Sequence, residues 1–369
     1  MSISLTRNQV NKILFLLVYW LSAAIFYIFL EMSIEGYTAS VYDIYKFNYS
    51  YNFVRILIIA CSAVIFGGFF LAVFEILFFN KLFRKKPFGT VLIVKSIFYI
   101  SGIFIFISIA TYISASFILN KDLLHISVFV RYMHFLSSPK VWAILLYWSF
   151  AVLSAFFVLN ISDKLGQGVL LNYVLGKYHT PKEENRVFMF LDLISSTKYA
   201  EKLGHKRYSM MIQDCYSDLT DAVIECSAQI YQYVGDEVVL TWDKSMGIKN
   251  NNCIKAFFEF KQILEMKKNY YEYKYECLPK FKAGANYGLV TVAEVGEMKK
   301  ELAYHGDAIN TAARIRSACN SFNKEFLISA DLLSILEKVD SDYRVESVGI
   351  TQLKGKQNFV GVLCVEEKI

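Results

Sequence analysis

The chain has 369 residues, a hydrophobic fraction of 55% and a formal net charge of +6, with a mean hydropathy of +0.36. That length allows two or three domains. The charge is modest and much of it lies beside hydrophobic segments, so it indicates membrane topology and argues against a nucleic acid partner. Apolar residues dominate up to about residue 162, and the remainder has the composition of an ordinary soluble α/β domain.

Four apolar stretches in the first half are each long enough to cross a bilayer, which takes about 20 helical residues. They lie at residues 13–32, 56–79, 91–119 and 141–161. The first is too long for a signal peptide and lacks a clear small-residue cleavage pattern after it. The sequence therefore predicts a four-helix transmembrane domain over residues 1–162.

The orientation of these spans follows from the charges in their connections. The loop between the second and third spans is short and strongly basic, with Lys81, Arg84, Lys85 and Lys86. Cytoplasmic loops carry an excess of Lys and Arg. We therefore expect a multi-pass protein of the cell membrane, with both termini and the second half of the chain in the cytoplasm.

Three polar side chains in or near the spans allow two interpretations each. Glu75 lies deep in the second span, where a carboxylate is costly and by default a functional candidate. The favoured interpretation is that it snorkels toward Lys81 or Arg84. His125 and His134 belong to an amphipathic segment, and we expect them at the outer membrane surface and not on a metal.

The segment at 163–184 contains three glycines and one proline amid a short apolar run. It is too structured for a flexible linker and too interrupted for one long helix. Its position predicts a rigid coupling between the membrane half and the second half. A plain spacer is the alternative.

The second half begins with a continuous apolar run at 186–191 that ends at Asp192. Such a run predicts a buried central strand. Ser195 and the two residues after it are good N-cap residues for the helix that follows. Asp192 is therefore expected at the carboxyl end of a strand, beside a helix N-terminus, where open sheets bind anionic ligands.

A hairpin is predicted at 229–242, because two β-rich runs flank Gly235 and Asp236. If its strands neighbour the first one, Asp192 and Asp236 come together. Two carboxylates in one cleft repel each other unless divalent cations neutralise them, and Mg²⁺ prefers a few carboxylates plus substrate phosphates.

Further along, residues 301–320 predict a turn at Gly306 and then a helix with an apolar face. Asn310 and Arg314 are four residues apart, so both project from the same side of that helix. An amide and a guanidinium in this arrangement suit a sugar and a phosphate. A solvated helix edge is the alternative if the pair stands alone.

Five motifs, FLDL, YVGDEVV, GANYGLV, HGDAINTAARI and LKGK, follow one another in this order. Together they resemble class III adenylate/guanylate cyclases over residues 186–366. The resemblance implies an α+β chain whose catalytic domain, at 185–369, has a ferredoxin-like βαββαβ core with extra strands. It also implies a head-to-tail homodimer with the active site between two subunits.

The same resemblance assigns roles to single positions. It places two divalent cations, Mg²⁺ or Mn²⁺, on Asp192, the carbonyl group of Leu193 and Asp236. Asn310 matches the residue that positions the ribose, and Arg314 matches the arginine that stabilises the pentavalent phosphorus.

Three further positions would contact the substrate. Lys354 matches the lysine that holds the terminal phosphates. The purine-reading pair, usually lysine and aspartate, is replaced here by Gln232 and Ala303. Because the glutamine amide both donates and accepts hydrogen bonds, adenine and guanine both remain open as the base.

The sequence thus predicts a membrane-bound homodimeric cyclase that converts ATP to 3′,5′-cyclic AMP and pyrophosphate. One alternative is a guanylate cyclase that uses GTP. The other is a membrane sensor whose cyclase-like domain binds a nucleotide without turnover. The intact set of metal-binding and phosphate-binding residues argues against the second alternative.

Overall fold

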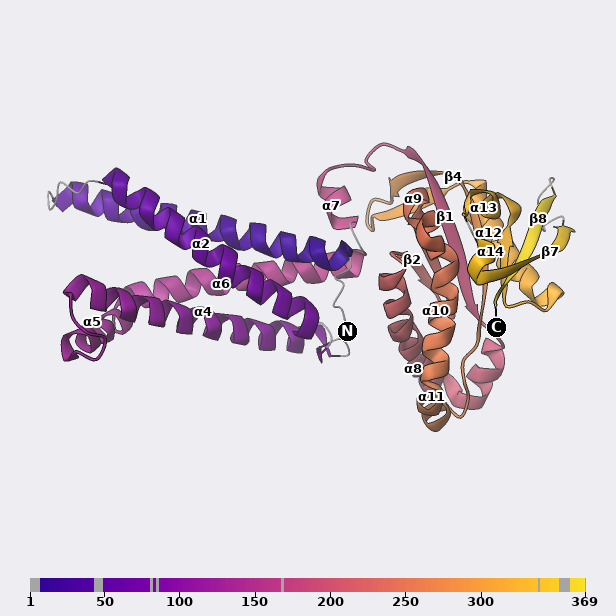
Figure 1. Cartoon of the computed structure of the whole chain (residues 1–369), viewed down its shortest axis with the longest axis horizontal. Helices are drawn as coiled ribbons and strands as arrows, with labels where there is room; N and C mark the ends of the chain where they lie inside the picture. The colour runs from indigo at the N-terminus through magenta and orange to yellow at the C-terminus, as the bar shows by residue number, and fades with distance from the viewer. Residues whose placement is uncertain are drawn as a thin grey trace. The chain divides into compact units, whose positions relative to one another are not determined.

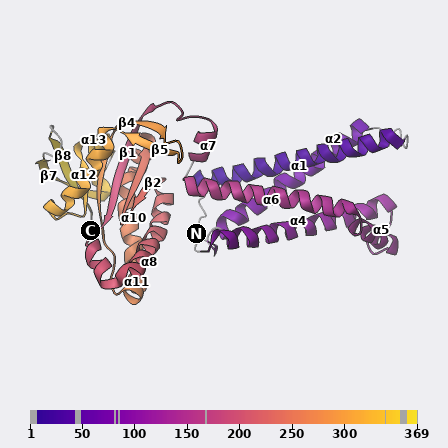
Figure 2. The same cartoon turned by 180° about the vertical axis from the view of Figure 1, so that it is seen from behind.

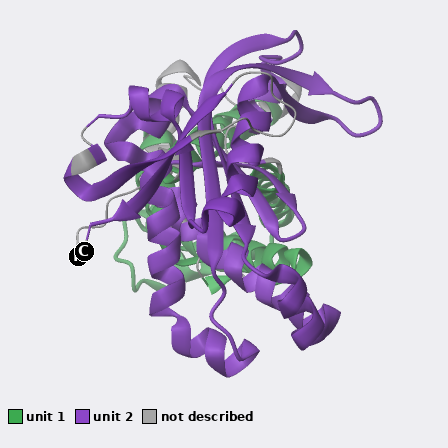
Figure 3. Ribbon diagram, turned by 90° about the vertical axis from the view of Figure 1, so that its right-hand side faces the viewer, with its two compact units in different colours: residues 1–164 green, residues 165–369 purple. Residues whose placement is uncertain are grey.

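The computed structural model describes residues 7–42, 49–79, 82–83, 86–166, 169–337, 339–351 and 359–368. The chain forms two compact units, Met1–Lys164 and Leu165–Ile369, which Figure 3 colours separately. The predicted three-part division at 162 and 184 remains a prediction.

The first unit is built from helices (Figure 1): α1 (Arg7–Tyr42), α2 (Tyr49–Phe74), the π-helical turn η1 (Glu75–Phe79), α4 (Phe88–Leu119), α5 (Ile126–Leu136) and α6 (Pro139–Leu165). All four predicted apolar stretches fall on these helices. Within the described residues, three segments are long and apolar enough to cross a membrane, namely Gln9–Ile34, Phe88–Leu119 and Pro139–Lys164. In the second predicted stretch, the apolar segment that is found, Ile65–Phe79, is shorter, so three candidate spans stand where four were predicted.

Small residues allow α6 to pack closely in the core of the first unit. Ala151, Val152 and Ala155 of α6 are at most 4% exposed, and the hydroxyl of Tyr19 on α1 donates to the carbonyl of Ala151 at 3.0 Å. Small side chains let membrane helices approach one another, and van der Waals contact then replaces the hydrophobic driving force that lipid does not supply. Aromatic rings, including that of Trp20, belong to the same buried cluster.

The favoured expectation for Glu75 is wrong. Its side chain does not snorkel, because it is only 2% exposed and ion-pairs with Lys95 of α4. Tyr99, one turn further along α4, donates to the other carboxylate oxygen at 3.1 Å. A buried carboxylate needs a counter-charge and hydrogen bonds, and the neighbouring helix supplies both.

The second unit contains a mixed sheet (Figure 2) made of β1 (Lys182–Leu193), β2 (Gln229–Val234), β3 (Glu237–Asp243), β4 (Phe281–Val295), β5 (Glu301–His305), β6 (Phe326–Ser329), β7 (Tyr343–Thr351) and β8 (Val360–Glu367). The strand order is β2-β3-β1-β4-β6-β8-β7, and β5 pairs with β4. The helices are α7 (Val169–Val174), α8 (Ser196–Glu225), α9 (Lys244–Ile248), η2 (Lys249–Asn251), α10 (Asn252–Met266), α11 (Lys268–Tyr275), α12 (Asp307–Phe322), α13 (Ala330–Ile335) and α14 (Val339–Asp342).

The predicted ferredoxin-like core is present. The chain runs β1-α8-β2-β3-α10-β4, and the four strands lie in the order β2-β3-β1-β4 with antiparallel pairing. The strands β6, β7 and β8 extend the sheet beyond β4. The α+β fold class predicted from the sequence is therefore confirmed.

Strand β1 lies between β3 and β4 in the sheet, and both of its faces are covered. Val187, Met189 and Leu191 belong to the main core with residues of α8 and α10. Phe188, which points to the opposite face, packs in a second cluster that includes Ala312 of α12. Burial on both sides explains why the sequence of this strand is a continuous apolar run and not an alternation.

The C-terminal end of the predicted coupling segment packs against the sheet. The carbonyl of Tyr178 accepts from the backbone N–H of Glu294 at 3.1 Å, and its hydroxyl donates to Glu184 at 2.9 Å. Gly166 and Gly176 have φ of +98° and +63°, backbone conformations that favour glycine. These contacts attach the end of the segment to the second unit, and its rigid coupling role stays a prediction.

Candidate active site

Two aspartates lie next to each other at one end of the sheet. In the β1–β3 pairing Asp192 faces Glu237, and the backbone N–H of Leu193 donates to the carbonyl of Asp236 at 3.3 Å. Asp236 occupies the tight turn between β2 and β3, where Gly235 has a φ of +62°. The structure therefore brings Asp192, Leu193 and Asp236 together.

The charge of Asp192 is compensated within the same chain. Its Oδ2 atom lies 3.1 Å from Lys282 Nζ of β4 and 3.2 Å from Arg316 Nη1 of α12. The other guanidinium nitrogen of Arg316 ion-pairs with Glu237. Of these four side chains none is more than 24% exposed, so each charge depends on its partners more than on water.

Lys282 and Arg316 were missed by the sequence analysis. Arg316 stands two residues after Arg314 in the HGDAINTAARI motif region, and Lys282 precedes GANYG. The only available signal was that both are charged residues next to apolar positions of a predicted strand and a predicted helix. Their partner Asp192 is far away in sequence, so no local pattern connects them.

Gly284 explains how α12 reaches Asp192. A Cβ atom placed on Gly284 would meet the backbone N of Arg316 at 2.0 Å and its Cα at 2.5 Å. Only glycine permits an approach this close between a strand and a helix. The first glycine of the GANYG motif thus sets the depth at which Arg316 enters the site.

Asn310 and Arg314 project away from this charge cluster. An α-helix turns by about 100° per residue, so Arg314 lies about 200° around α12 from Arg316. Asn310 stands one turn before Arg314, on the same side, and is exposed, its amide donating to the Gly306 carbonyl at 3.3 Å. The structure therefore does not bring this pair to the Asp192 of its own subunit.

The two positions predicted to read the base lie on different strands. Gln232 is exposed on β2, opposite Val239, beside an irregularity in the pairing. Ala303 lies on β5, opposite Ala293. Their chain neighbours Tyr231 and Tyr304 contact each other, with ring centroids 4.8 Å apart.

Tyr304 is held in place from several sides. Its ring contacts Phe188 at 5.3 Å between centroids, and the guanidinium of Arg186 lies 5.1 Å from the ring centroid. Burial raises the pKa of Tyr304 to about 12, although the nearby Arg186 lowers it. Its hydroxyl is therefore neutral at physiological pH, where it can both donate and accept hydrogen bonds.

The donor set at this end of the sheet fits a hard divalent cation. Asp192 and Asp236 supply carboxylate oxygens and Leu193 supplies a carbonyl, and Mg²⁺ is commonly held by one or two carboxylates with substrate phosphates. Within the described residues no ion pair to the Asp236 carboxylate is formed. No cluster of three or more His, Cys, Asp or Glu side chains suited to a metal occurs in the part of the chain that the structure describes.

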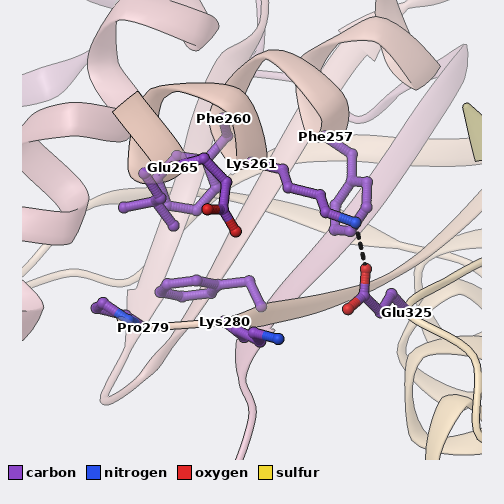
Figure 4. Close-up of a pocket in the computed structure, with 9 residues that line it drawn as sticks. Phe257, Phe260, Lys261, Glu265, Pro279, Lys280 and Glu325 are labelled. Atoms are coloured by element: carbon purple, nitrogen blue, oxygen red, sulfur yellow. Dashed lines mark hydrogen bonds and ion pairs between the residues drawn. The ribbon is translucent and has the colours of Figure 1, made fainter. Parts of the chain in front are cut away.

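Lys354 lies outside the described residues. A cavity of about 220 Å³ on the α10 side of the sheet contains none of the predicted site residues. Figure 4 shows it lined by Phe257, Phe260 and neighbouring side chains, with Lys261 bonded to Glu325 at 2.6 Å.

Comparison with known proteins identifies the family. The family model for the adenylate and guanylate cyclase catalytic domain matches residues 179–365, which is about half of the chain. The chain therefore belongs to the class III adenylate/guanylate cyclase family.

Among individual relatives, "Adenylate cyclase 2" of Rhizobium meliloti (strain 1021) is 33% identical over 209 residues, which is 57% of each chain. The match thus spans little more than half the length of that relative. Two structures of a bacterial light-regulated adenylyl cyclase share the fold, with TM-scores of 0.52 and 0.51 at 17% and 18% identity, over 62% of this chain and 66% of theirs.

We predict that Arg316→Met lowers the free energy of unfolding by about 2–4 kcal/mol, because it leaves Glu237 without its counter-charge in a buried position. Burial already raises the pKa of Glu237, against the opposing charge of Arg316. Without Arg316 that pKa rises further. A carboxyl group whose pKa is raised in the folded state destabilises the fold when it is ionised. This destabilisation is complete above the folded-state pKa and decreases as the pH falls through it.

The loss should therefore be larger at about pH 8 than at about pH 5, as measured by urea unfolding of the full chain in detergent. The matched control is the double variant Arg316→Met with Glu237→Gln, which removes both charges and should recover most of the stability. An equal loss in the single and double variants would contradict the ion-pair account.

Proposed function

We propose that this chain is a membrane-bound adenylate cyclase that converts ATP to 3′,5′-cyclic AMP and pyrophosphate for intracellular signalling. Family membership supports a nucleotidyl cyclase, and the observation that carries the proposal is the adjacency of Asp192 and Asp236 at one end of the sheet. The name of the 33% identical relative, an adenylate cyclase, supports ATP as the substrate.

The chain's own residues would position the substrate for in-line attack of the ribose 3′-hydroxyl on the α-phosphate. Bound to Asp192, the Leu193 carbonyl and Asp236, two Mg²⁺ or Mn²⁺ ions would lower the pKa of that hydroxyl and neutralise the leaving pyrophosphate. Lys282 and Arg316 fix the orientation of the Asp192 carboxylate. That carboxylate is therefore oriented before substrate arrives, which limits reorganisation during the reaction.

The remaining assignments concern the sugar and the phosphates. Asn310 would hold the ribose, which keeps the 3′-oxygen close to the α-phosphorus. The planar guanidinium of Arg314 donates in a fork that suits phosphate oxygens and the charge that develops on them. Lys354 is proposed to hold the terminal phosphates.

The base is proposed to be adenine. Gln232 offers one donor and one acceptor, while Ala303 offers no polar group. Guanine needs an acceptor for its N1–H and amino group, and neither reading position carries an acidic residue. We therefore expect ATP to be preferred by a modest margin, since the site does not rely on a matched pair of buried polar groups.

The test is a comparison of kcat/KM for ATP and GTP with purified full chain and identical Mn²⁺. We expect ATP to be favoured by about 10–200-fold, the range of a site that tolerates an analogue. A preference for GTP would support the guanylate cyclase alternative. Absence of cyclic product from either nucleotide would instead support a sensor that binds nucleotide without turnover.

A homodimer is proposed because one chain does not assemble the whole site. Arg314 and Asn310 lie on the side of α12 that faces away from Asp192, by the helical geometry described above. A second copy in a symmetric arrangement would place its Asn310 and Arg314 against the aspartates of the first. The active site would then lie between two subunits.

Complementation between inactive variants tests this arrangement. Asp192→Ala and Arg314→Ala should each lower kcat by at least about 10²-fold. Mixing the two, under conditions where subunits exchange, should restore one working site in each heterodimer.

The control is a mixture of Asp192→Ala with Asp236→Ala. Both changes remove ligands from the same side of the site, so no heterodimer contains an intact site. Equal activity in the two mixtures would contradict a site shared between subunits.

The first unit is proposed to anchor the protein in the cell membrane through four spans, with α2 and η1 together as the second, so that both termini lie in the cytoplasm. Its apolar helices support the membrane location, and the basic residues at 81–86 favour a cytoplasmic connection there. This orientation gives the catalytic unit access to cellular nucleotides.

Reporter fusions test the orientation. An alkaline phosphatase fusion after Lys86 should be inactive, because the enzyme needs export from the cytoplasm, and one after Lys121 should be active. A fusion at the C-terminus serves as the cytoplasmic control. An active fusion after Lys86 would invert the proposed topology.

A further inference from the structure

The membrane unit contains a cavity that the proposed reaction does not use. It has a volume of about 810 Å³ and lies between α1, α2, α4 and α6, with one residue of α5. Ligand sites in proteins typically measure about 300–1,000 Å³. Much of its surface is aromatic, contributed by Trp20, Tyr27, Phe66, Phe70, Phe106 and Trp148.

The cavity is elongated along the helices. On α4 its lining begins at Tyr99 and ends at Thr111, a distance of about 18 Å at 1.5 Å per residue. On α1 the lining runs from Trp20 to Glu31, which corresponds to about 16 Å. A long, narrow molecule therefore fits this space better than a compact one.

Two glycines line the cavity beside open space. Gly67 of α2 and Gly102 of α4 line it, and a Cβ atom added to either would meet nothing within 4 Å. Glycine in a membrane helix commonly marks a place where helices approach closely, which these two positions do not show. A larger side chain at either position would therefore extend into the open space of the cavity.

Both ends of the cavity carry charges that are already neutralised. At one end Lys140 ion-pairs with Glu31. At the other, Tyr99 lines the cavity and donates its hydroxyl hydrogen to Glu75, which is ion-paired with Lys95. Because no net charge faces the cavity, a charged ligand would lose its hydration without gaining a counter-ion.

The Tyr99 hydroxyl gives the site a hydrogen-bonding preference. Its hydrogen is within reach of Glu75 Oε2 at 3.1 Å and of the Leu71 carbonyl at 3.3 Å, so the oxygen acts as a donor toward these groups and keeps its capacity as an acceptor. Glu75 stands at the start of a π-helical turn, a local irregularity that frequently occurs at functional sites. A ligand that reaches this end is therefore recognised through a donor group, such as a hydroxyl.

We propose that the membrane unit binds a neutral, elongated lipid that carries a hydroxyl group, with its chain along the aromatic surface and its hydroxyl donating to Tyr99. The site is independent of the nucleotide chemistry proposed above. The proposal assigns a ligand of defined chemical class to the membrane half of this protein.

The test uses the full chain in phosphatidylcholine vesicles and a hexadecanol bearing a mid-chain diazirine as the photoreactive probe. Labelling should saturate, map to the cavity segments of α1, α2 and α4, and be displaced by unlabelled hexadecanol. Gly102→Leu should reduce labelling by about tenfold or more, because even one methylene in an apolar site is worth about 10–200-fold.

Gly89→Leu is the matched control. Gly89 lies on the same helix, also has nothing within 4 Å of an added Cβ, and does not line the cavity, so labelling should remain at the wild-type level. Tyr99→Phe keeps the ring and removes the acceptor. This change should weaken the binding of hexadecanol by about threefold to tenfold and leave the binding of the methyl ether of the same probe unchanged.

Three results would overturn the proposal. Labelling that rises linearly with probe and spreads over outward-facing positions such as Phe117 and Leu146 would mean that bulk lipid fills the space. Stronger displacement by hexadecanoate than by hexadecanol would contradict a neutral ligand. Equal effects of Tyr99→Phe on the alcohol and its ether would contradict the hydroxyl contact.

Discussion

Two carboxylates placed side by side at one end of a β-sheet repel each other, and the catalytic unit is arranged around that repulsion. Asp192 is fixed by a central strand and Asp236 by a tight turn, so neither can move away. Lys282 and Arg316 supply the positive charge that the fold itself can offer. Gly284 is the steric condition for this arrangement, because only its missing side chain lets α12 bring Arg316 to the aspartate.

The same helix then serves two surfaces. Arg316 faces inward to the sheet, while Asn310 and Arg314, about 200° away around the helix axis, face outward. A helix cannot turn both faces toward one aspartate pair, since its side chains radiate from a single axis. The charge balance inside one chain therefore does not involve the face of α12 that carries Asn310 and Arg314, and this face is proposed to meet a second subunit. This is the physical basis on which a shared site between two subunits is proposed.

Local patterns predicted the parts of the structure that local physics determines. The apolar run before Asp192, the glycine turn at Asp236 and the i, i+4 spacing of Asn310 and Arg314 each carry their signal within a few residues, and the structure contains the strand, the hairpin and the helix. The ion pairs of Asp192 with Lys282 and Arg316 join residues about 90 and 124 positions apart, and only the folded sheet places them together. The prediction for Glu75 was wrong for the same reason. Its partner Lys95 is on the next helix and not in the adjoining loop.

Burial of charge leads to opposite outcomes in the two units. In the catalytic unit the aspartates lie at a sheet end where a highly charged nucleotide and its cations can complete the balance, so net charge is useful there. In the membrane unit Glu75 and Lys95 are at most 5% exposed, and lipid offers no ions or water to complete a deficit. The pair must therefore be neutral by itself, and its remaining hydrogen-bonding capacity passes through Tyr99 to the cavity. The proposed lipid site would therefore distinguish molecules by their donor groups and their length, whereas the proposed catalytic site would distinguish them by charge.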